Sequence, residues 1–237
     1  MRAAVCNELF GSLPFAEQCR LVAAHGFQGI ELAPFTLAED PTRLAGSRIA
    51  EIHRIIQDAG LVCVGLHWLL RAPPGLHLAA PDSVLRRRSW ETVSRLVDLC
   101  RDLRGEVMVL GSGKQRSAQG LPPAEGCRIL QDGLAALAPK VESAGVRLLL
   151  EALPARTTNT VNTLAEAGAV IGAIGRPGIS SLLDFHNTTD ECEPWDVLIR
   201  RHRDLIAHVH LNEVDGYHPS LAAGSGRNGR SGFLRNR

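Results

Sequence analysis

The sequence lacks three features that would place a protein in a special class. It has no surplus of charge, since 26 Lys and Arg residues stand against 25 Asp and Glu residues and the formal net charge is +1. No long-range field would therefore recruit nucleic acid or an anionic membrane. No apolar run approaches a membrane span, and the N-terminus has neither the apolar core nor the cleavage site of a signal peptide. We expect a cytoplasmic protein that acts on a small molecule.

The cysteines also lack the spacing of a redox or zinc motif. None of the six is paired as CxxC, and five of them fall on predicted strands and helices, the exception being Cys192. This placement favours reduced thiols that pack as small hydrophobic side chains. The residues are Cys6, Cys19, Cys63, Cys100, Cys127 and Cys192.

The sequence does contain a strict alternation of seven short apolar runs with six longer amphipathic runs. The runs predict strands at 3–6, 29–32, 61–67, 107–110, 146–150, 179–183 and 205–211, and helices at 14–25, 48–59, 83–103, 124–143, 163–174 and 195–204. Strands that are apolar on both faces are buried on both faces, which indicates a parallel sheet covered by helices.

Two architectures fit this alternation, an open doubly wound sheet and a closed (β/α) barrel. An open sheet normally binds its ligand at a switch point, often through a glycine-rich first turn. The first turn here reads Asn7-Glu8-Leu9-Phe10-Gly11 and has no phosphate fingerprint. The regular repeat, without a second subdomain, favours a TIM-type barrel over residues 1–217.

The repeat stops before the end of the chain. Residues 218–237 are rich in Gly and Arg and have no strand-length apolar run. This composition predicts a disordered tail, because it cannot bury enough surface to offset the entropy of ordering. We therefore expect an incomplete barrel of about seven strands. Its unpaired first and last strands would favour association into a homo-oligomer.

Polar or ionisable residues follow almost every predicted strand. In a parallel barrel the catalytic groups lie at this rim, and a purely structural barrel has no reason to collect them there. The collection therefore predicts a functional site. In chain order its members are Asn7, Glu8, Glu31, His67, the turn at 111–114, Glu151, Asp184, His186 and His210.

Glu151, Asp184 and His210 form a set of two carboxylates and one imidazole. Such a set suits Mn²⁺, Mg²⁺ or Co²⁺ and is less typical of structural zinc. Asp184 and His186 are two residues apart, so on an extended backbone both would point toward one ligand. Structural alternatives remain open: Glu151 paired with Arg147, and Asp184 acting as a helix N-cap.

The turn from Gly111 to Arg116 offers a further contact. Its backbone N–H groups and the two cations Lys114 and Arg116 could hold a phosphate or a sugar oxygen. A polar turn with solvated charges explains the same residues equally well.

Four stretches, 29–32, 149–151, 182–186 and 208–213, each carry an ionisable residue at a predicted strand end. In their order and placement they resemble the sugar phosphate isomerase/epimerase family. That family shares the xylose isomerase-like TIM barrel with ketose 3-epimerases, hydroxypyruvate isomerase, inosose dehydratase and an endonuclease of abasic DNA. The resemblance runs from the first strand to about Tyr217.

The resemblance implies a divalent metal, with Mn²⁺ favoured and Mg²⁺, Co²⁺ or Zn²⁺ as alternatives. Glu151, Asp184 and His210 would hold it, and Glu151 would also transfer the proton. The family's fourth ligand, a glutamate after an eighth strand, has no counterpart in this chain. Truncation or a reading-frame shift near residue 219 would explain its absence. Predicted substrate contacts are His186, His67, Glu31, Asn7 and Lys114, with His186 one residue closer to the aspartate than in the ketose epimerases.

Three functions remain open at this point. The first is a sugar or sugar-phosphate isomerase or epimerase, acting beside a carbonyl group through an enediolate. The second is a catalytically defective or truncated barrel, which the atypical tail favours. The third is an abasic-site endonuclease of the same fold, which needs a basic groove that a net charge of +1 argues against.

Overall fold

The computed structural model describes residues 2–212, in which seven parallel strands alternate with helices. The strands are β1 (Ala4–Cys6), β2 (Gly29–Leu32), β3 (Val62–Leu66), β4 (Val107–Leu110), β5 (Arg147–Glu151), β6 (Ile179–Asp184) and β7 (Ile206–His210). The helices are α1 (Phe15–Ala24), α2 (Gly46–Asp58), α3 (Ser83–Asp102), α4 (Gly113–Arg116), α5 (Pro123–Ser143), α6 (Leu164–Ile174) and α7 (Trp195–His202).

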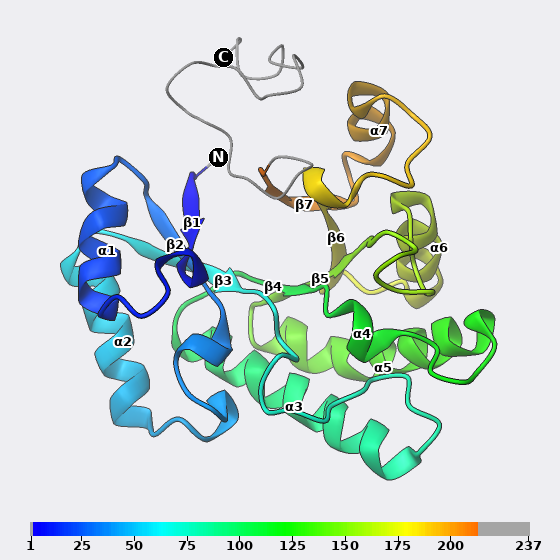
Figure 1. Ribbon diagram of the computed structural model, residues 1–237, viewed down its shortest axis with the longest axis horizontal. Coiled ribbons are helices and arrows are strands. Elements are labelled where there is room, and N and C mark those ends of the chain that lie inside the picture. The colour runs from blue at the N-terminus through cyan, green and yellow to red at the C-terminus, as the bar shows by residue number, and fades with distance from the viewer. Residues whose placement is uncertain (1, 213–237) are drawn as a thin grey trace.

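The strands follow one another in the sheet in chain order, from β1 to β7, and all neighbouring pairs are parallel. The sheet curls, and the larger helices lie around its outer side (Figure 1). Within residues 2–212 the hydrogen-bonded order is open, because β7 and β1 do not pair. The predicted incomplete seven-stranded TIM-type barrel is therefore confirmed. The predicted tail at 218–237 lies outside the described residues, so the domain division stays a prediction.

Two apolar layers fix the direction in which each strand points its side chains. Met108 and Leu150 belong to the large core between the sheet and the helices. Leu149 and Leu182 belong to a smaller cluster on the inner side of the sheet. Since side chains alternate along a strand, the last residues of β5 and β6 share the inner side with Leu149 and Leu182. The barrel's carboxylates thus face its interior.

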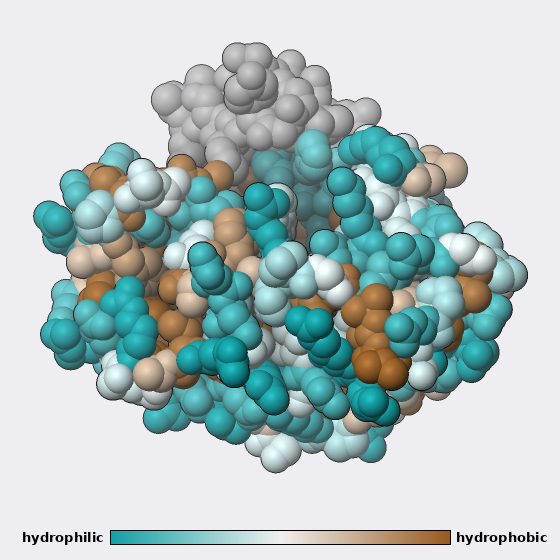
Figure 2. Space-filling model, turned by 60° about the horizontal axis from the view of Figure 1, so that its bottom comes forward, coloured by the Kyte–Doolittle hydropathy of each residue, from teal (hydrophilic) through white to brown (hydrophobic). Residues whose placement is uncertain are grey.

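The helix ends follow ordinary capping chemistry. The Asp82 side chain accepts hydrogen bonds from the backbone N–H groups of the first turn of α3, and Thr163 caps α6 in the same way. Gly60 and Gly145 end α2 and α5 with positive φ angles of 73° and 68°, which glycine adopts without strain. The outward surface over α2, α3 and α5 is mainly hydrophilic with scattered apolar clusters (Figure 2).

The predicted segments match these elements to within a few residues, and 29–32 and 107–110 match β2 and β4 at both ends. The sequence pattern did not predict the short helix α4 or the 3₁₀ turns η1 (Asn7–Phe10) and η4 (Phe185–Asn187). No helix in residues 2–212 is both long and apolar enough to cross a membrane. The cytoplasmic location stays a prediction.

Candidate metal centre

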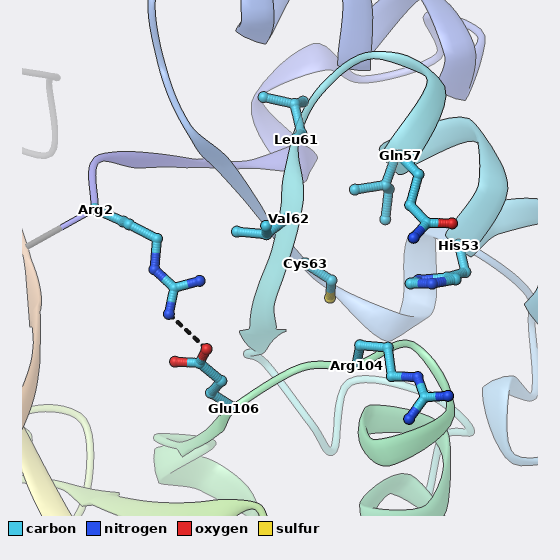
Figure 3. Close-up of a pocket in the computed structure, with 9 residues that line it drawn as sticks. Arg2, His53, Gln57, Leu61, Val62, Cys63, Arg104 and Glu106 are labelled. Atoms are coloured by element: carbon cyan, nitrogen blue, oxygen red, sulfur yellow. Dashed lines mark hydrogen bonds and ion pairs between the residues drawn. The ribbon is translucent and has the colours of Figure 1, made fainter.

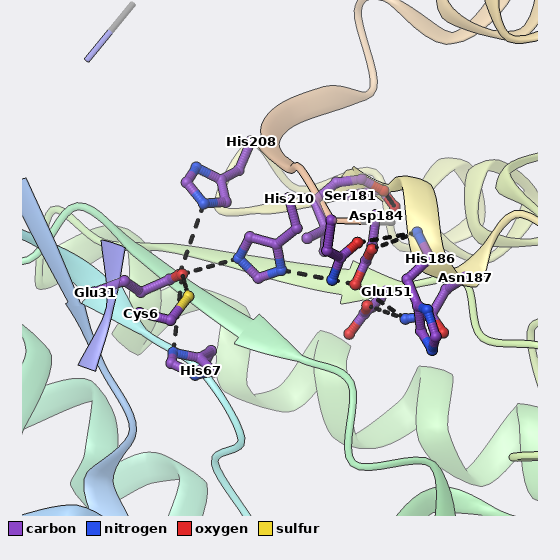
Figure 4. A network of polar contacts seen from close by, with 12 residues as sticks. Cys6, Glu31, His67, Glu151, Ser181, Asp184, His186, Asn187, His208 and His210 are labelled. Carbon is purple, nitrogen blue, oxygen red and sulfur yellow. Dashed lines mark hydrogen bonds and ion pairs between the residues drawn. The ribbon is translucent and has the colours of Figure 1, made fainter. Parts of the chain in front are cut away.

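The carboxyl ends of the strands bring one polar network together on the inner side of the sheet (Figure 4). Glu151 and Asp184 are the last residues of β5 and β6, and His210 is the last residue of β7. Each of the three offers one ligand atom, and these atoms all lie within 4.8 Å of one another. The three predicted metal ligands therefore share one place in the fold.

Glu151 is a buried carboxylate in an acidic environment. It is 6% exposed, and burial, reinforced by the negative charge of Asp184, raises its pKa above the usual range. The Asn187 amide donates to Glu151 Oε1 at 2.8 Å and to Asp184 Oδ2 at 3.1 Å. In residues 2–212, no lysine or arginine forms an ion pair with either carboxylate. The positive charges of His210 and Arg116 lower the pKa of Glu151 only in part, so burial and Asp184 prevail.

Gly111 and Arg116, which both follow β4, shape the space around Glu151. A Cβ atom at Gly111 would stand 2.3 Å from Glu151 Oε2, so only glycine leaves room for this carboxylate position. Arg116 is fully buried and donates to the backbone oxygens of Gly111, Glu151 and Thr160 at 2.8, 2.7 and 3.1 Å. Arg116 therefore fixes the backbone below the site. The prediction that Arg116 helps to hold a substrate oxygen is wrong, because its donors are used inside the protein.

His210 joins the two acidic regions of the network. Its Nε2 lies 2.8 Å from Glu31 Oε2, and its Nδ1 lies 3.9 Å from Asp184 Oδ2. Burial lowers the pKa of His210, but the charge of Glu31 and the hydrogen bond to it outweigh burial and raise the pKa to about 9. Burial likewise raises the pKa of Glu31, but His210 outweighs that effect and leaves the pKa well below its usual range. Without a metal, the two residues form a buried ion pair.

Glu31 is the centre of the second region, which lies at the ends of β1, β2 and β3. Its carboxylate accepts a hydrogen bond from the Cys6 thiol at 3.2 Å, and its oxygens lie 3.8 Å from His67 Nδ1 and 3.7 Å from His208 Nε2. Glu31 and His67 are 2% and 3% exposed. Glu31 thus organises the interior, although the sequence pattern predicted only a substrate contact for it.

The predicted geometry of Asp184 and His186 is wrong. The strand ends at Asp184 and turns at once into η4, so the two residues are not on one extended backbone. Asp184 Oδ1 caps this turn by accepting from the His186 N–H at 2.8 Å, while Oδ2 faces Asn187 and His210. The N-cap and ligand interpretations therefore apply to different oxygens of one side chain.

Sequence reasoning missed Asn187, which donates to both carboxylates. One signal was available. In the family that the sequence resembles, the histidine after the aspartate stands one residue farther along, and that position is Asn187 here. The Asn187 amide therefore occupies the position at which the ketose epimerases carry the histidine.

Two of the predicted substrate contacts have other surroundings. Asn7 is 1% exposed, accepts from the Ala33 N–H at 2.7 Å and donates to Thr36 Oγ1 at 2.8 Å, so its polar atoms hold the loop after β2. Lys114 lies exposed on α4. The alternative partner of Glu151, Arg147, is exposed at the opposite end of β5 and does not reach the carboxylate.

A separate cavity lies at the other end of the sheet, near the start of β3 (Figure 3). Its mouth carries an ion pair between Arg2 and Glu106, whose side chains are 49% and 62% exposed. Exposed pairs of this kind contribute little free energy. The site is therefore better placed at the carboxyl ends of the strands, where buried ionisable groups converge.

The residues around Glu151 fit a divalent metal. Two carboxylates and one imidazole form an oxygen-rich donor set. Burial and, after it, the negative charge of Asp184 raise the pKa of Glu151, and a cation would neutralise that charge. His210 presents Nδ1 to this place while Nε2 contacts Glu31. This is the usual arrangement of a metal-binding histidine whose second nitrogen is held by a carboxylate.

Comparison with known families agrees with the fold. Residues 19–230 match the family model described as the xylose isomerase-like TIM barrel. The chain belongs to this family. That family and its sugar-epimerase relatives confirm the resemblance to sugar phosphate isomerases and epimerases.

Relatives of this xylose isomerase-like barrel include sugar epimerases. A 3-dehydro-D-guloside 4-epimerase of Escherichia coli K12 is 23% identical over 233 residues, which cover 92% of this chain and 82% of the relative. An L-ribulose 3-epimerase of Mesorhizobium japonicum is 29% identical over 190 residues, which cover 78% of this chain but only 60% of the relative. A solved D-psicose 3-epimerase, crystallised in the presence of D-fructose, has a TM-score of 0.79 at 20% identity over 91% of this chain and 74% of its own. That structural likeness supports the fold.

Proposed function

We propose that this protein is a divalent-metal-dependent sugar or sugar-phosphate epimerase or isomerase that moves a proton beside a carbonyl group. The supporting observation is the convergence of Glu151, Asp184 and His210 at three consecutive strand ends. This donor set suits Mn²⁺, Mg²⁺ or Co²⁺, with Zn²⁺ less typical, and the resemblance to the isomerase/epimerase family favours Mn²⁺. The names of the two relatives, both epimerases of sugars or sugar derivatives, support the substrate class.

In this proposal the residues of the site divide the work between them. Glu151, Asp184 and His210 Nδ1 hold the ion, and Glu31 orients the His210 ring through Nε2. The bound ion would supply stabilisation of the negative charge that develops on the substrate's oxygens. Glu151 also takes the carbon-bound proton and returns it.

The substrate would approach from the rim formed by the segments after the strands. His186 in η4 and Lys114 on α4 are proposed to contact its oxygens, and Lys114 would suit a phosphate or carboxylate group. His67 lies deeper and is proposed as an inner contact. We propose that Asn7 and Glu31 act indirectly, because their polar atoms already contact protein groups.

Exchange of the substrate's carbon-bound proton tests the function. The full chain is incubated in D₂O with Mn²⁺ and, separately, D-fructose, D-allulose or L-ribulose, and deuterium incorporation is followed by NMR. Exchange should occur with at least one ketose and stop when a chelator removes the metal. Glu151→Gln should lower the rate by at least about 100-fold, because it removes the proton acceptor. The exposed Glu51 on α2 supplies the matched control, Glu51→Gln.

The products separate active from defective barrels. Exchange with formation of the epimer means that protons are both removed and returned on a new face. Exchange without the epimer means that one proton-transfer group works alone, as expected of a defective barrel. Absence of both exchange and Mn²⁺ binding would rule out the proposed function.

A further inference from the structure

Three side chains at the ends of β1, β2 and β3 form a second cluster of potential ligands. Cys6, Glu31 and His67 each offer one ligand atom, and these atoms lie within 4.8 Å of one another. Cys6 Sγ is 3.2 Å from Glu31 Oε2, and His67 Nδ1 is 3.8 Å from the same oxygen (Figure 4). None of the three belongs to the Glu151 cluster, although His210 contacts Glu31.

Buried atoms in this cluster lack hydrogen-bond partners. Glu31 and His67 are more than nine-tenths buried. Within the described part of the chain, Glu31 Oε1 and His67 Nδ1 make no hydrogen bond. A buried polar atom left in this way destabilises the folded protein. A cation between them would satisfy atoms that the protein itself leaves open.

The surroundings of His67 indicate which nitrogen would bind. Nε2 lies 2.8 Å from Glu8 Oε2, and Nδ1 faces Glu31. A histidine that binds a metal through one nitrogen usually presents the N–H of the other to a carboxylate. Glu8 is thus placed to hold the ring while Nδ1 remains available as a ligand.

We propose that Cys6, Glu31 and His67 form a second metal site, which takes a thiophilic divalent ion such as Zn²⁺ or Co²⁺. A thiolate, a carboxylate and an imidazole are suitable ligands for these ions, and a fourth position stays open to water. On binding, the Cys6 thiol loses its proton to solvent and the S–H bond is replaced by a sulfur–metal bond. Glu31 Oε2 faces Cys6, His67 and His210, so the ion would share this carboxylate with His210. This site goes beyond the proposed epimerase function, and it separates Cys6 from the cysteines expected to be simple packing residues.

Titration of the full chain with Co²⁺ tests the site, because a thiolate ligand gives cobalt a strong charge-transfer absorption in the near ultraviolet. The Glu151 cluster has no sulfur and cannot produce this band. The band should appear in the unmodified chain and in Asp184→Asn, which disables the first site. It should vanish in Cys6→Ser. The exposed Cys192 gives the matched control, and Cys192→Ser should keep the band.

Several outcomes would overturn the proposal. The first is that the unmodified chain shows no band at saturating Co²⁺. The second is that Cys6→Ser keeps the band, and the third is that Cys192→Ser loses it. Circular dichroism checks that Cys6→Ser is folded. If it is not, His67→Gln retains the thiol and should raise the Co²⁺ concentration at half-saturation at least about tenfold. An unchanged midpoint in that variant would count equally against the site. Mn²⁺ binding at Asp184 is measured separately, so failure here leaves the proposed function standing.

Discussion

Glu31 and Glu151 are both buried glutamates at the same rim, yet their pKa values shift in opposite directions. Burial raises the pKa of each carboxyl group. Beside Glu151 the next influence is Asp184, which raises the pKa further. Beside Glu31 it is His210, whose positive charge and hydrogen bond reverse the effect of burial. Burial thus sets the cost of the charge, and the neighbours decide whether the charge is kept.

The comparison distinguishes two ways of holding a buried carboxylate. Glu31 finds its cation in the protein, in the imidazole of His210. Glu151 and Asp184 share a neutral amide donor, Asn187, and the His210 ring reaches Asp184 Oδ2 only at 3.9 Å. Glu31 Oε2 therefore has a cationic partner within the protein, whereas the Glu151–Asp184 pair favours a cation from solution.

Removing a carboxylate from the region around Glu151 should have the largest effect. Asp184→Asn should weaken Mn²⁺ binding by more than about 100-fold, because loss of a ligand exceeds the 10- to 100-fold loss typical of an outer contact. Calorimetry or the electron paramagnetic resonance of free Mn²⁺ measures the change. Asp132→Asn on the exposed face of α5 is the control. Equal affinities in the two variants would contradict the assignment of Asp184.

The pH dependence of Mn²⁺ binding should reveal the ion pair between His210 and Glu31, which loses its proton when the metal binds. With a pKa of about 9, His210 carries a proton at neutral pH that Mn²⁺ displaces. Affinity should therefore rise with pH, by up to about tenfold per pH unit, and level off near pH 9. In Glu31→Gln the levelling point should move toward 6.5, the ordinary value for histidine. A flat profile between about pH 6 and the histidine's pKa of about 9 would exclude a protonated His210.

The stability of the metal-free chain should respond with opposite signs in the two regions. Glu31→Gln should lower the free energy of unfolding by roughly 1–3 kcal/mol, since it leaves His210 without its partner. Glu151→Gln should leave the free energy unchanged or raise it, because it removes a like charge beside Asp184. Urea unfolding in the presence of chelator measures both.

The sign of the Glu31→Gln effect can be checked against pH. The raised pKa of His210 contributes stability that is complete below pH 6.5 and is lost as pH rises through about 9. The lowered pKa of Glu31 contributes stability that is present above pH 4.5 and is lost at lower pH. The difference between the variant and the unmodified chain should thus be greatest between pH 4.5 and 6.5. A difference that grows toward pH 9 would contradict the ion pair.

A smaller effect is expected from the space beside Glu151. In Gly111→Ala the new Cβ would stand 2.3 Å from Glu151 Oε2, so the carboxylate must move. Mn²⁺ affinity should fall by about tenfold or less, the size of an outer-contact defect. Gly46 begins α2, and a Cβ added there would meet no atom within 4 Å, so Gly46→Ala supplies the control. Unaltered affinity in Gly111→Ala would show that the carboxylate tolerates displacement.

The fold could be predicted from the sequence because hydrophobic periodicity depends on local residue order. The β5 run, apolar on both faces and ending in Glu151, indicates the strand, its burial and its polar end at once. The same rule locates Asp184 and His210. These three positions follow from strand ends alone.

The remaining contacts depend on backbone geometry that periodicity does not encode. The turn of η4 directly after Asp184 decides that Asn187 rather than His186 meets Glu151. The pairing of β2 with β3 shifts register between Ile30 and Glu31. Glu31 lies directly after this shift, and its Oε2 is 3.8 Å from His67 Nδ1. Local sequence predicts only a packing role for Cys6, because its hydrogen-bond partner Glu31 is 25 positions away in the chain.

Arg116 gives the barrel a further property. It fastens the ends of β4 and β5 and the segment before α6 through the carbonyl oxygens of Gly111, Glu151 and Thr160. Every amino acid has that oxygen, so these three hydrogen bonds do not require a particular side chain at the accepting position, although the Thr160 hydroxyl adds a bond to the Arg116 backbone oxygen. Substitutions at the rim can therefore alter the chemistry while the framework beneath persists. To introduce a new specificity, a protein engineer would keep Arg116 and vary the side chains at the rim of the barrel.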